Sequence, residues 1–286
     1  MTAPIAAGPT GATGTPWRVW ARQTWAVARL ELPRCVKGGR AAALYLLAAA
    51  PIGLMAMAAV AVALQSFEPS PAESERGFAA VYAVFVLRWC VFFACVAVFL
   101  NLFRSEVVDG TLHYWLLAPV RREALVLGKY GAGLAVTATV MTAATVVAAL
   151  MTYIPFDTAV TLDRLVVGPA LAHVASFALA TALACVGYGA LSLLLGIWFR
   201  NPVLPTLSVL GWEYVNFLLP PALRSASIVF HLQSLLPLPL TEGPLGVVAE
   251  PSPPAVAVTG ILVFSAVCQA LAAWRLRRME VAYGEG

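Results

Sequence analysis

The stretch FRSEVVDGTLHYWLLAPVRREALVLGKYG, residues 103–131, is a charged segment between two long apolar runs. It holds three arginines, one lysine, two glutamates and one aspartate, although charged residues make up only 11% of the 286-residue chain. Soluble domains carry about 25% charged residues, and the mean hydropathy of the whole chain is +0.84. These values place the sequence among membrane proteins, with the charged stretch outside the membrane between two spans.

The apolar residues of the chain fall into six windows. Each window has about 20 residues, enough for a helix to cross a hydrocarbon core of about 30 Å, and continuous apolar runs disagree with the alternating strands of a barrel. Pro202 is expected to separate the fourth window from the fifth, with one long kinked span as the alternative. The sequence therefore predicts an all-α integral membrane protein with six transmembrane helices, at about 41–64, 78–103, 130–154, 168–197, 203–220 and 254–274.

The distribution of basic residues predicts the orientation of these spans. With both termini in the cytoplasm, 14 of the 18 lysines and arginines lie on the cytoplasmic side, and only Arg76, Arg164 and Arg224 lie outside. Such an excess of positive charge on the inner side is typical of multi-pass membrane proteins. We therefore expect a protein of the inner (cytoplasmic) membrane with a cytoplasmic N-terminus, a cytoplasmic C-terminus and a cytoplasmic charged stretch.

The N-terminal segment precedes the first span. Residues 1–16 are small and uncharged and lack the apolar core of a signal peptide, so we expect a disordered lead and then a single transmembrane domain over 17–286. Residues 15–32 are predicted to form an amphipathic helix with one basic face, formed by Arg18, Arg22 and Arg29. Such a helix is expected to lie against anionic headgroups on the inner membrane surface. Whether it only anchors the chain or also contacts a cytoplasmic partner stays open.

The charged stretch itself is expected to contain a short helix parallel to the membrane. Asp109 or Thr111 can cap its first turn, and Pro119 disfavours helix for the residue before it. Three apolar side chains with the spacing i, i+3, i+4 give it one apolar face, namely Leu112, Trp115 and Leu116. Such a helix either floats in the membrane interface or docks into the groove of a cytoplasmic partner, and its residues leave both open.

The charged stretch resembles the inner loop of the permease subunits of type-2 ABC exporters. The resemblance extends to the six spans, the basic N-terminal helix and the long last outer loop at about 221–253, so it covers nearly the whole chain. The many prolines of that outer loop depart from the family pattern. The residues of the loop that carry the resemblance are Glu106, Gly110, Thr111, Leu112, Pro119, Arg121, Arg122, Gly128 and Lys129.

In that family the inner loop between spans two and three carries a coupling helix, which sits in a cleft of the ATPase subunit and transmits nucleotide-driven motion. The resemblance implies that the apolar face at 112–116 docks there and that Glu106 marks the hinge between span two and the loop. Arg121 and Arg122 would meet acidic residues of the ATPase or lipid phosphates, and positive-inside anchoring is the simpler interpretation of both and of Lys129. The implied partners are a cytoplasmic ABC ATPase, a second permease copy or a paralogue in a dimer, and membrane lipids.

Two charged residues lie within predicted spans. Arg88 falls about ten residues into span two and Glu213 about ten residues into span five, so both are expected near the middle of the membrane. An ionised side chain at that depth costs about 2.5–3.5 kcal/mol, so it should face protein or water. We predict that Arg88 and Glu213 pair within one chain or across a dimer. Their role is either to fix two helices or to contact a substrate.

The sequence offers little catalytic chemistry. The phosphate-binding pattern GxxxxGK[ST] is absent, and the three histidines, His113, His173 and His231, lie at different predicted depths. We therefore expect no catalytic residue, metal site, cofactor or nucleic-acid partner for this chain, with ATP and Mg²⁺ bound by the partner ATPase. The expected function is a permease for a hydrophobic or amphipathic substrate. The alternatives are an integral-membrane enzyme acting on a lipid and a sensor or scaffold subunit that transports nothing.

Overall fold

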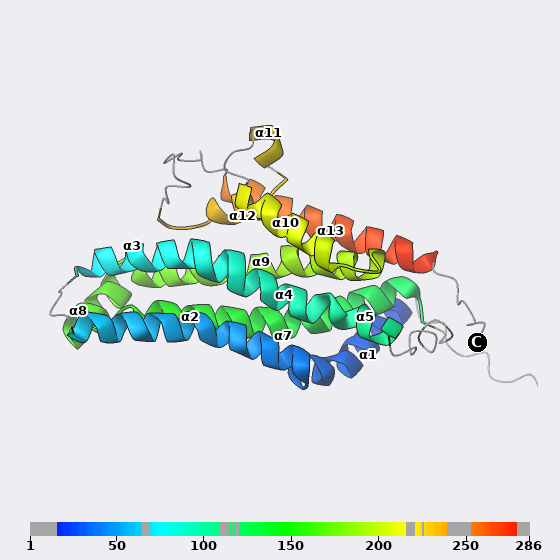
Figure 1. Cartoon of the computed structure of the whole chain (residues 1–286), viewed down its shortest axis with the longest axis horizontal. Coiled ribbons are helices and arrows are strands. Elements are labelled where there is room, and N and C mark those ends of the chain that lie inside the picture. The colour runs from blue at the N-terminus through cyan, green and yellow to red at the C-terminus, as the bar shows by residue number, and fades with distance from the viewer. Residues whose placement is uncertain are drawn as a thin grey trace, which may run out of the picture.

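The computed structural model describes residues 16–64, 69–108, 115, 117, 120–215, 221–224, 226–238 and 253–278. The regular secondary structure of these residues is entirely helical, as predicted (Figure 1). The helices are α1 (Pro16–Val36), α2 (Gly39–Leu64), α3 (Pro71–Val81), η1 (Tyr82–Val91), α4 (Phe92–Phe99), α5 (Asn101–Val108), α7 (Arg122–Met151), α8 (Thr158–Leu162), η2 (Asp163–Val167), α9 (Ala170–Trp198), α10 (Val203–Val215), α11 (Pro221–Arg224), α12 (Ile228–Gln233) and α13 (Pro254–Arg277).

Five helices are long and apolar enough to cross a membrane, which supports a multi-pass, all-α membrane protein. They are α2, the continuous helix Pro71–Glu106, α7, α9 and α13. The sixth predicted span, 203–220, corresponds to α10, which has only 13 residues and is therefore about 20 Å long. Residues 216–220 lie outside the described residues, so the part of the chain that the structure describes holds five such spans and not the predicted six.

The second span begins earlier than the sequence predicted. The predicted spans 41–64 and 78–103 leave residues 65–77 as an outer loop, but α3 starts at Pro71 because Ser70 and Glu73 form a capping box. The Ser70 hydroxyl accepts from the Glu73 amide, and the Glu73 carboxylate accepts from the Ser70 amide at 2.8 Å. The helix then widens into the π-helical segment η1, which carries Arg88. π-helical turns within α-helices occur frequently at functional sites.

The predicted break between the fourth and fifth spans is confirmed. Helix α9 ends at Trp198, Phe199 is extended, and α10 begins at Val203 after Pro202. The N-terminal helix is likewise confirmed, although α1 continues through Pro33 to Val36 instead of ending near residue 32.

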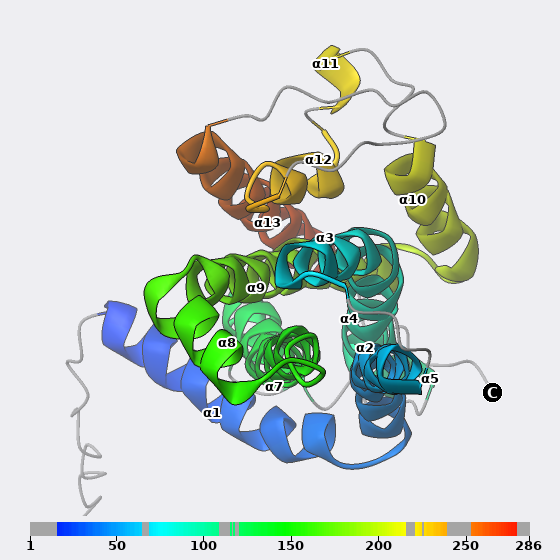
Figure 2. The same cartoon turned by 90° about the vertical axis from the view of Figure 1, so that its left-hand side faces the viewer.

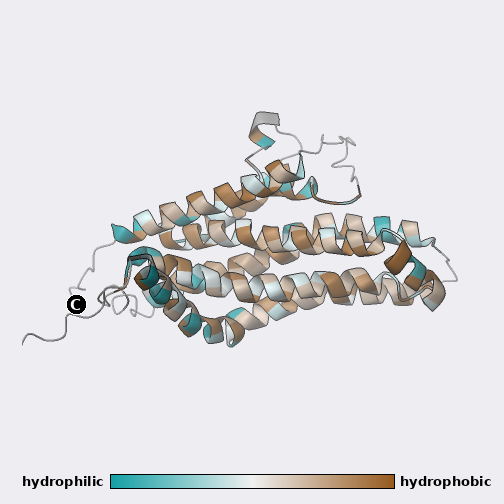
Figure 3. Cartoon of the chain, turned by 180° about the vertical axis from the view of Figure 1, so that it is seen from behind, coloured by the Kyte–Doolittle hydropathy of each residue, from teal (hydrophilic) through white to brown (hydrophobic). Residues whose placement is uncertain are grey.

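The helices form layers that can be followed in Figure 2. Helices α2 and α7 lie on one side, α3–α5 and α9 in the middle, and α10, α12 and α13 on the other side. Helix α1 crosses α7 at the end of the bundle where α5 and α13 also end (Figures 1 and 2). We call this end the charged end, because the hydrophilic colouring gathers on α1 there (Figure 3).

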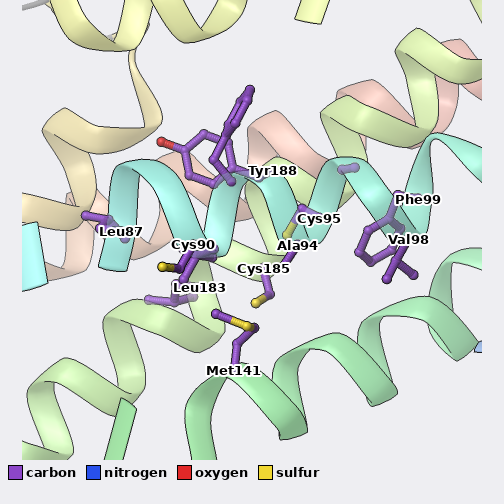
Figure 4. Packing of buried hydrophobic residues seen from close by; sticks show 14 of the residues in the cluster. Leu87, Cys90, Ala94, Cys95, Val98, Phe99, Met141, Leu183, Cys185 and Tyr188 are labelled. Atoms are coloured by element: carbon purple, nitrogen blue, oxygen red, sulfur yellow. The ribbon is translucent and has the colours of Figure 1, made fainter. Parts of the chain in front are cut away.

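The core lies where η1 and α4 pack against α7 and α9. Figure 4 shows Cys90 of η1 and Cys95 of α4 close to Leu183 and Cys185 of α9, with Met141 of α7 below them. The five cysteines are all free and buried, which agrees with packing as their role. By contrast, little of α2 and α13 is buried, and their exposed residues are mainly apolar, as expected of helices that face lipid or another subunit.

Candidate functional site

A buried lysine holds the charged end together. Lys129, in the second turn of α7, has no exposed side-chain surface. Its ammonium group donates to the Glu106 carboxylate at 2.7 Å, to the Glu31 carboxylate at 3.2 Å and to the Leu102 carbonyl at 3.1 Å. An ammonium has three donors, so all of them are used. Lys129, read from the sequence as a surface anchor, is thus the centre of a buried ionic site.

Two arginines complete this site around the two carboxylates. The Arg34 guanidinium lies 3.5 Å from Glu31 and 3.7 Å from Glu106, and the Arg40 guanidinium lies 3.7 Å from Glu31. We call Glu31, Arg34, Arg40, Glu106 and Lys129 the Lys129 cluster. It joins α1, α2, α5 and α7, which are separate in sequence, so a displacement of one of these helices is resisted by charges on the other three.

Glycine at position 128 allows α1 to reach this lysine. A Cβ atom at Gly128 would lie 2.7 Å from the Thr24 carbonyl oxygen and 2.7 Å from the Val27 side chain of α1, closer than such atoms approach. The close crossing of α1 over α7 therefore requires glycine at this point. The sequence singled out Gly128 and Lys129 only through the family resemblance. In the structure, Gly128 allows α1 and α7 to approach closely, and Lys129 supplies the positive charge between them.

Trp115 of the predicted docking face lies against the cluster. The Lys129 nitrogen is 5.5 Å from the centroid of the Trp115 ring and 5.2 Å from that of Phe103, within the range of a cation–π contact. Trp115 is partly buried against the core, whereas Leu117 is 64% exposed. Positions 115 and 117 lie about 200° apart on a helix. In the single chain Leu117 therefore faces solvent and Trp115 faces the Lys129 cluster, whereas the sequence predicted that Trp115 faces a partner.

The other predicted coupling residues divide into two groups. Arg121 is exposed and its backbone amide donates to the Gln23 side chain of α1 at 3.4 Å. Arg122 donates to the Leu276 carbonyl at 2.7 Å and the Arg277 carbonyl at 2.6 Å, so it ties the start of α7 to the end of α13. The remaining predicted residues lie outside the described residues, namely Gly110, Thr111, Leu112, Leu116 and Pro119.

The predicted pair of Arg88 and Glu213 takes a different form within the chain. No ion pair shorter than 4.0 Å joins these two described residues, although Arg88 lies within electrostatic range of Glu213. The Glu213 carboxylate, buried on α10, instead accepts from the Ser227 hydroxyl at 2.7 Å and from the amides of Ile228 and Val229 at 3.1 and 3.0 Å. A carboxylate is well satisfied by the amides and positive end of a helix, which explains why Glu213 caps α12. Pairing across a dimer stays a prediction.

A second buried polar group lies at the opposite end of the bundle. Glu75 of α3 accepts a hydrogen bond from the Tyr153 hydroxyl at 3.1 Å, and its other oxygen lies 3.1 Å from Nδ1 of His173 on α9. We call Glu75, Tyr153 and His173 the Glu75 cluster. Among the described residues no group of three or more His, Cys, Asp or Glu side chains could hold a metal ion.

Sequence reasoning missed Glu31, Glu75 and Tyr153. Glu31 lies in the N-terminal helix, for which the sequence predicts a basic face formed by Arg18, Arg22 and Arg29. The structure buries Glu31, and nothing in the local sequence indicates this burial. Glu75 belongs to the capped turn that was read as loop.

Comparison with known protein families gives a match over much of the chain. Residues 35–212, more than half of the chain, match the family model described as ABC-2 family transporter protein. The matched range contains Arg40, Glu106 and Lys129 of the Lys129 cluster, as well as the described part of the inner loop. No curated protein matches the sequence.

Proposed function

Because the chain belongs to the ABC-2 transporter family, we propose that it is the transmembrane permease subunit of an exporter driven by a separate ATPase. Permeases of this family generally work with an ATPase subunit. The ATPase would bind ATP and Mg²⁺, and this chain would supply the path across the membrane. The observation that carries the proposal is the attachment of the inner loop to the buried Lys129 cluster.

The Lys129 cluster gives this loop a rigid base. The loop leaves α5 two residues after Glu106 and returns to α7 seven residues before Lys129, so both of its ends are held by the same ion pair. Removing one partner from a buried pair costs about 3–5 kcal/mol. A displacement of the loop is therefore transmitted to α5 and α7, because the ion pair keeps its ends from moving separately. We assign contact with the ATPase to the family's coupling helix at 111–118.

Two contacts at the charged end support six crossings. Arg104 of α5 donates to the Arg200 carbonyl beyond the end of α9, and Arg122 of α7 donates to the end of α13. Since α9 and α13 both end at the charged end, the chain between them must return to the opposite end. Helix α10 lies in this interval and would form part of that fifth crossing. The excess of basic residues assigns the charged end, with both termini, to the cytoplasm.

A second permease would cover the exposed side of α10. This helix contacts the rest of the chain sparsely and exposes Val203, Leu204 and Leu207. A dimer through α10 would enclose a path lined mainly by apolar side chains, which favours a hydrophobic or amphipathic cargo over a free ion.

The decisive experiment is co-purification of the full chain with its ATPase subunit. Leu117→Asp places a charge on the exposed side of the loop, and we expect it to abolish ATPase binding while membrane insertion and thermal midpoint stay unchanged. The matched control is Arg200→Gln, an exposed change at the charged end outside the loop, where only the backbone carbonyl makes a contact within the chain. ATPase binding that survives Leu117→Asp would contradict docking through this side. Transport by the chain without any ATPase would contradict the proposed function as a whole.

A further inference from the structure

The turn between α1 and α2 forms a basic pocket at the charged end. Gly38 has φ +100°, a conformation that L side chains rarely adopt, and it lets α2 leave α1 sharply. The turn borders an open surface pocket of about 500 Å³. Its lining consists of Pro33, Arg34, Lys37, Gly38, Gly39 and Arg40, which we call the elbow pocket.

The charges around the elbow pocket do not balance. The Lys129 cluster and Lys37 together contain four cations, namely Arg34, Lys37, Arg40 and Lys129. Among the described residues they are partly balanced by two carboxylates, Glu31 and Glu106. Lys129 makes the shortest contacts with both carboxylates. The arginines reach them only at 3.5–3.7 Å. Two positive charges are thus in excess, and three of the cations, Arg34, Lys37 and Arg40, line the pocket.

The geometry of the pocket suits a phosphate. Arg40 is held in place by a hydrogen bond from its second guanidinium nitrogen to the Ser105 hydroxyl at 3.0 Å. The Arg34 side chain is 57% exposed, and Lys37 is exposed as well. Guanidinium groups bind phosphate oxygens in pairs, and the start of α2 adds the positive end of a 26-residue helix. The pocket therefore combines the hydrogen-bonded Arg40 and two exposed cations with a helix N-terminus.

The surface beside the pocket suits an acyl chain. Val36 at the end of α1 and Tyr45 and Leu46 on α2 are exposed, and the Tyr45 hydroxyl donates to the Val36 carbonyl at 3.3 Å. Helix α2 continues from there as an apolar and largely exposed span. A ligand with a phosphate in the pocket and hydrocarbon along α2 satisfies both surfaces at once.

We propose that the elbow pocket binds the phosphate of an anionic phospholipid. The shared chemistry is a phosphate group, and the apolar surface of α2 assigns it to a lipid headgroup and not to free phosphate. The bound phosphate supplies the missing negative charge beside Arg34 and Arg40 and so fixes the Lys129 cluster and α1. Binding does not depend on the proposed function, but one consequence does: if the chain is a permease, its coupling to the ATPase requires anionic lipid.

The test measures binding of short-chain lipids to the detergent-solubilised full chain. The probes are dihexanoyl phosphatidylglycerol, dihexanoyl phosphatidylcholine and inorganic phosphate, each titrated while the thermal midpoint is followed. We expect saturable stabilisation by phosphatidylglycerol, little by phosphatidylcholine and little by inorganic phosphate. Since each basic residue near an anionic surface contributes about 1 kcal/mol, Lys37→Gln should weaken phosphatidylglycerol binding about five-fold and the double change with Arg34→Gln about 30-fold.

The matched control is Arg29→Gln, which removes the same charge from an exposed position of α1 outside the pocket. We expect less than a two-fold effect from it. Lys37 makes no ion pair within the described part of the chain, so Lys37→Gln keeps the fold and serves as the variant that decides the result. An equal loss in Arg29→Gln would overturn the pocket. Phosphatidylcholine bound as tightly as phosphatidylglycerol, or inorganic phosphate bound as tightly as either, would overturn the anionic lipid as its ligand.

Discussion

The two ends of the bundle bury polar groups in different ways. At the charged end, the Lys129 cluster places three cations around two carboxylates and joins four helices. At the opposite end, the Glu75 cluster places one carboxylate between a tyrosine and a histidine, beside a cavity of about 10 Å³ that has room for about one water. Burial, and after it the Glu75 carboxylate, raises the pKa of the Tyr153 phenol, so Tyr153 stays a neutral donor.

The difference shows which end resists deformation. Separating the charged groups at Lys129 leaves unpaired ions in a buried site, whereas opening the Glu75 cluster exposes hydrogen-bonding groups that water can satisfy through the adjoining cavity. The charged end is the end at which the inner loop attaches. If a partner displaces the permease at the charged end, the helices there must resist deformation. The Glu75 cluster at the opposite end can open at a lower free-energy cost.

The largest expected effect comes from removing the central cation. Lys129→Met keeps the length of the side chain but leaves Glu31 and Glu106 buried side by side without their shared partner. We expect the free energy of unfolding to fall by about 3–5 kcal/mol, measured by chemical unfolding of the detergent-solubilised chain. Lys37→Met removes an exposed lysine of the same end and should change it by less than about 0.5 kcal/mol. Equal effects of the two changes would mean that the Lys129 cluster does not hold this end.

The second prediction separates the α1 crossing from the charges. Gly128→Ala brings a methyl group to within 2.7 Å of the Thr24 carbonyl, so α1 must shift away from α7. We expect a loss of about 1–3 kcal/mol, as for other overpacked sites. Gly131→Ala is the matched control on α7, because a Cβ atom there meets nothing within 4 Å.

Cys35 reports directly on whether α1 stays docked. Its thiol is fully buried at the end of α1, and this burial, followed by the Glu31 carboxylate, raises its pKa to about 11. At pH 8 the thiol therefore stays protonated and unreactive, because the thiolate is the nucleophile. Maleimide labelling of Cys35 should be slow in the unchanged chain and in Gly131→Ala, and fast in Gly128→Ala. Slow labelling in Gly128→Ala would show that α1 absorbs the methyl group without leaving α7.

The third prediction concerns the softer end. Tyr153→Phe removes the hydroxyl that donates to Glu75 and leaves the ring in place. A hydrogen bond to a charged group contributes about 1.5–3 kcal/mol, and we expect a value at the low end of that range because the adjoining cavity admits a replacement water. Chemical unfolding measures the loss, and Tyr45→Phe, which removes an exposed hydroxyl on α2, is the control. A loss as large as that of Lys129→Met would erase the contrast between the two ends.

The sequence predicted the helical membrane class, the N-terminal helix and five of the spans, because apolar runs and basic residues are local signals. It also singled out Glu106 and Lys129, but it did not predict that they pair. They are 23 residues apart, on two helices whose contact depends on tertiary packing, and Lys129 in isolation resembles any cytoplasmic anchor. The start of α3, by contrast, could have been predicted from the sequence, because residues 70–73, Ser-Pro-Ala-Glu, carry the pattern of its capping box.

The smallest expected effect distinguishes the two positions proposed for Trp115. If its ring faces Lys129, Trp115→Phe keeps an aromatic face toward the ammonium group, and Trp115→Leu loses about 0.5–1 kcal/mol of cation–π attraction. In both variants the ATPase should still co-purify, because the exposed side of the loop is unchanged. If Trp115 belongs to the docking face, as its spacing from Leu112 suggested, Trp115→Leu weakens ATPase binding and leaves the free energy of unfolding unchanged. Measuring both quantities on the same two variants therefore assigns the ring to the Lys129 cluster or to the partner, since each position moves one quantity and spares the other.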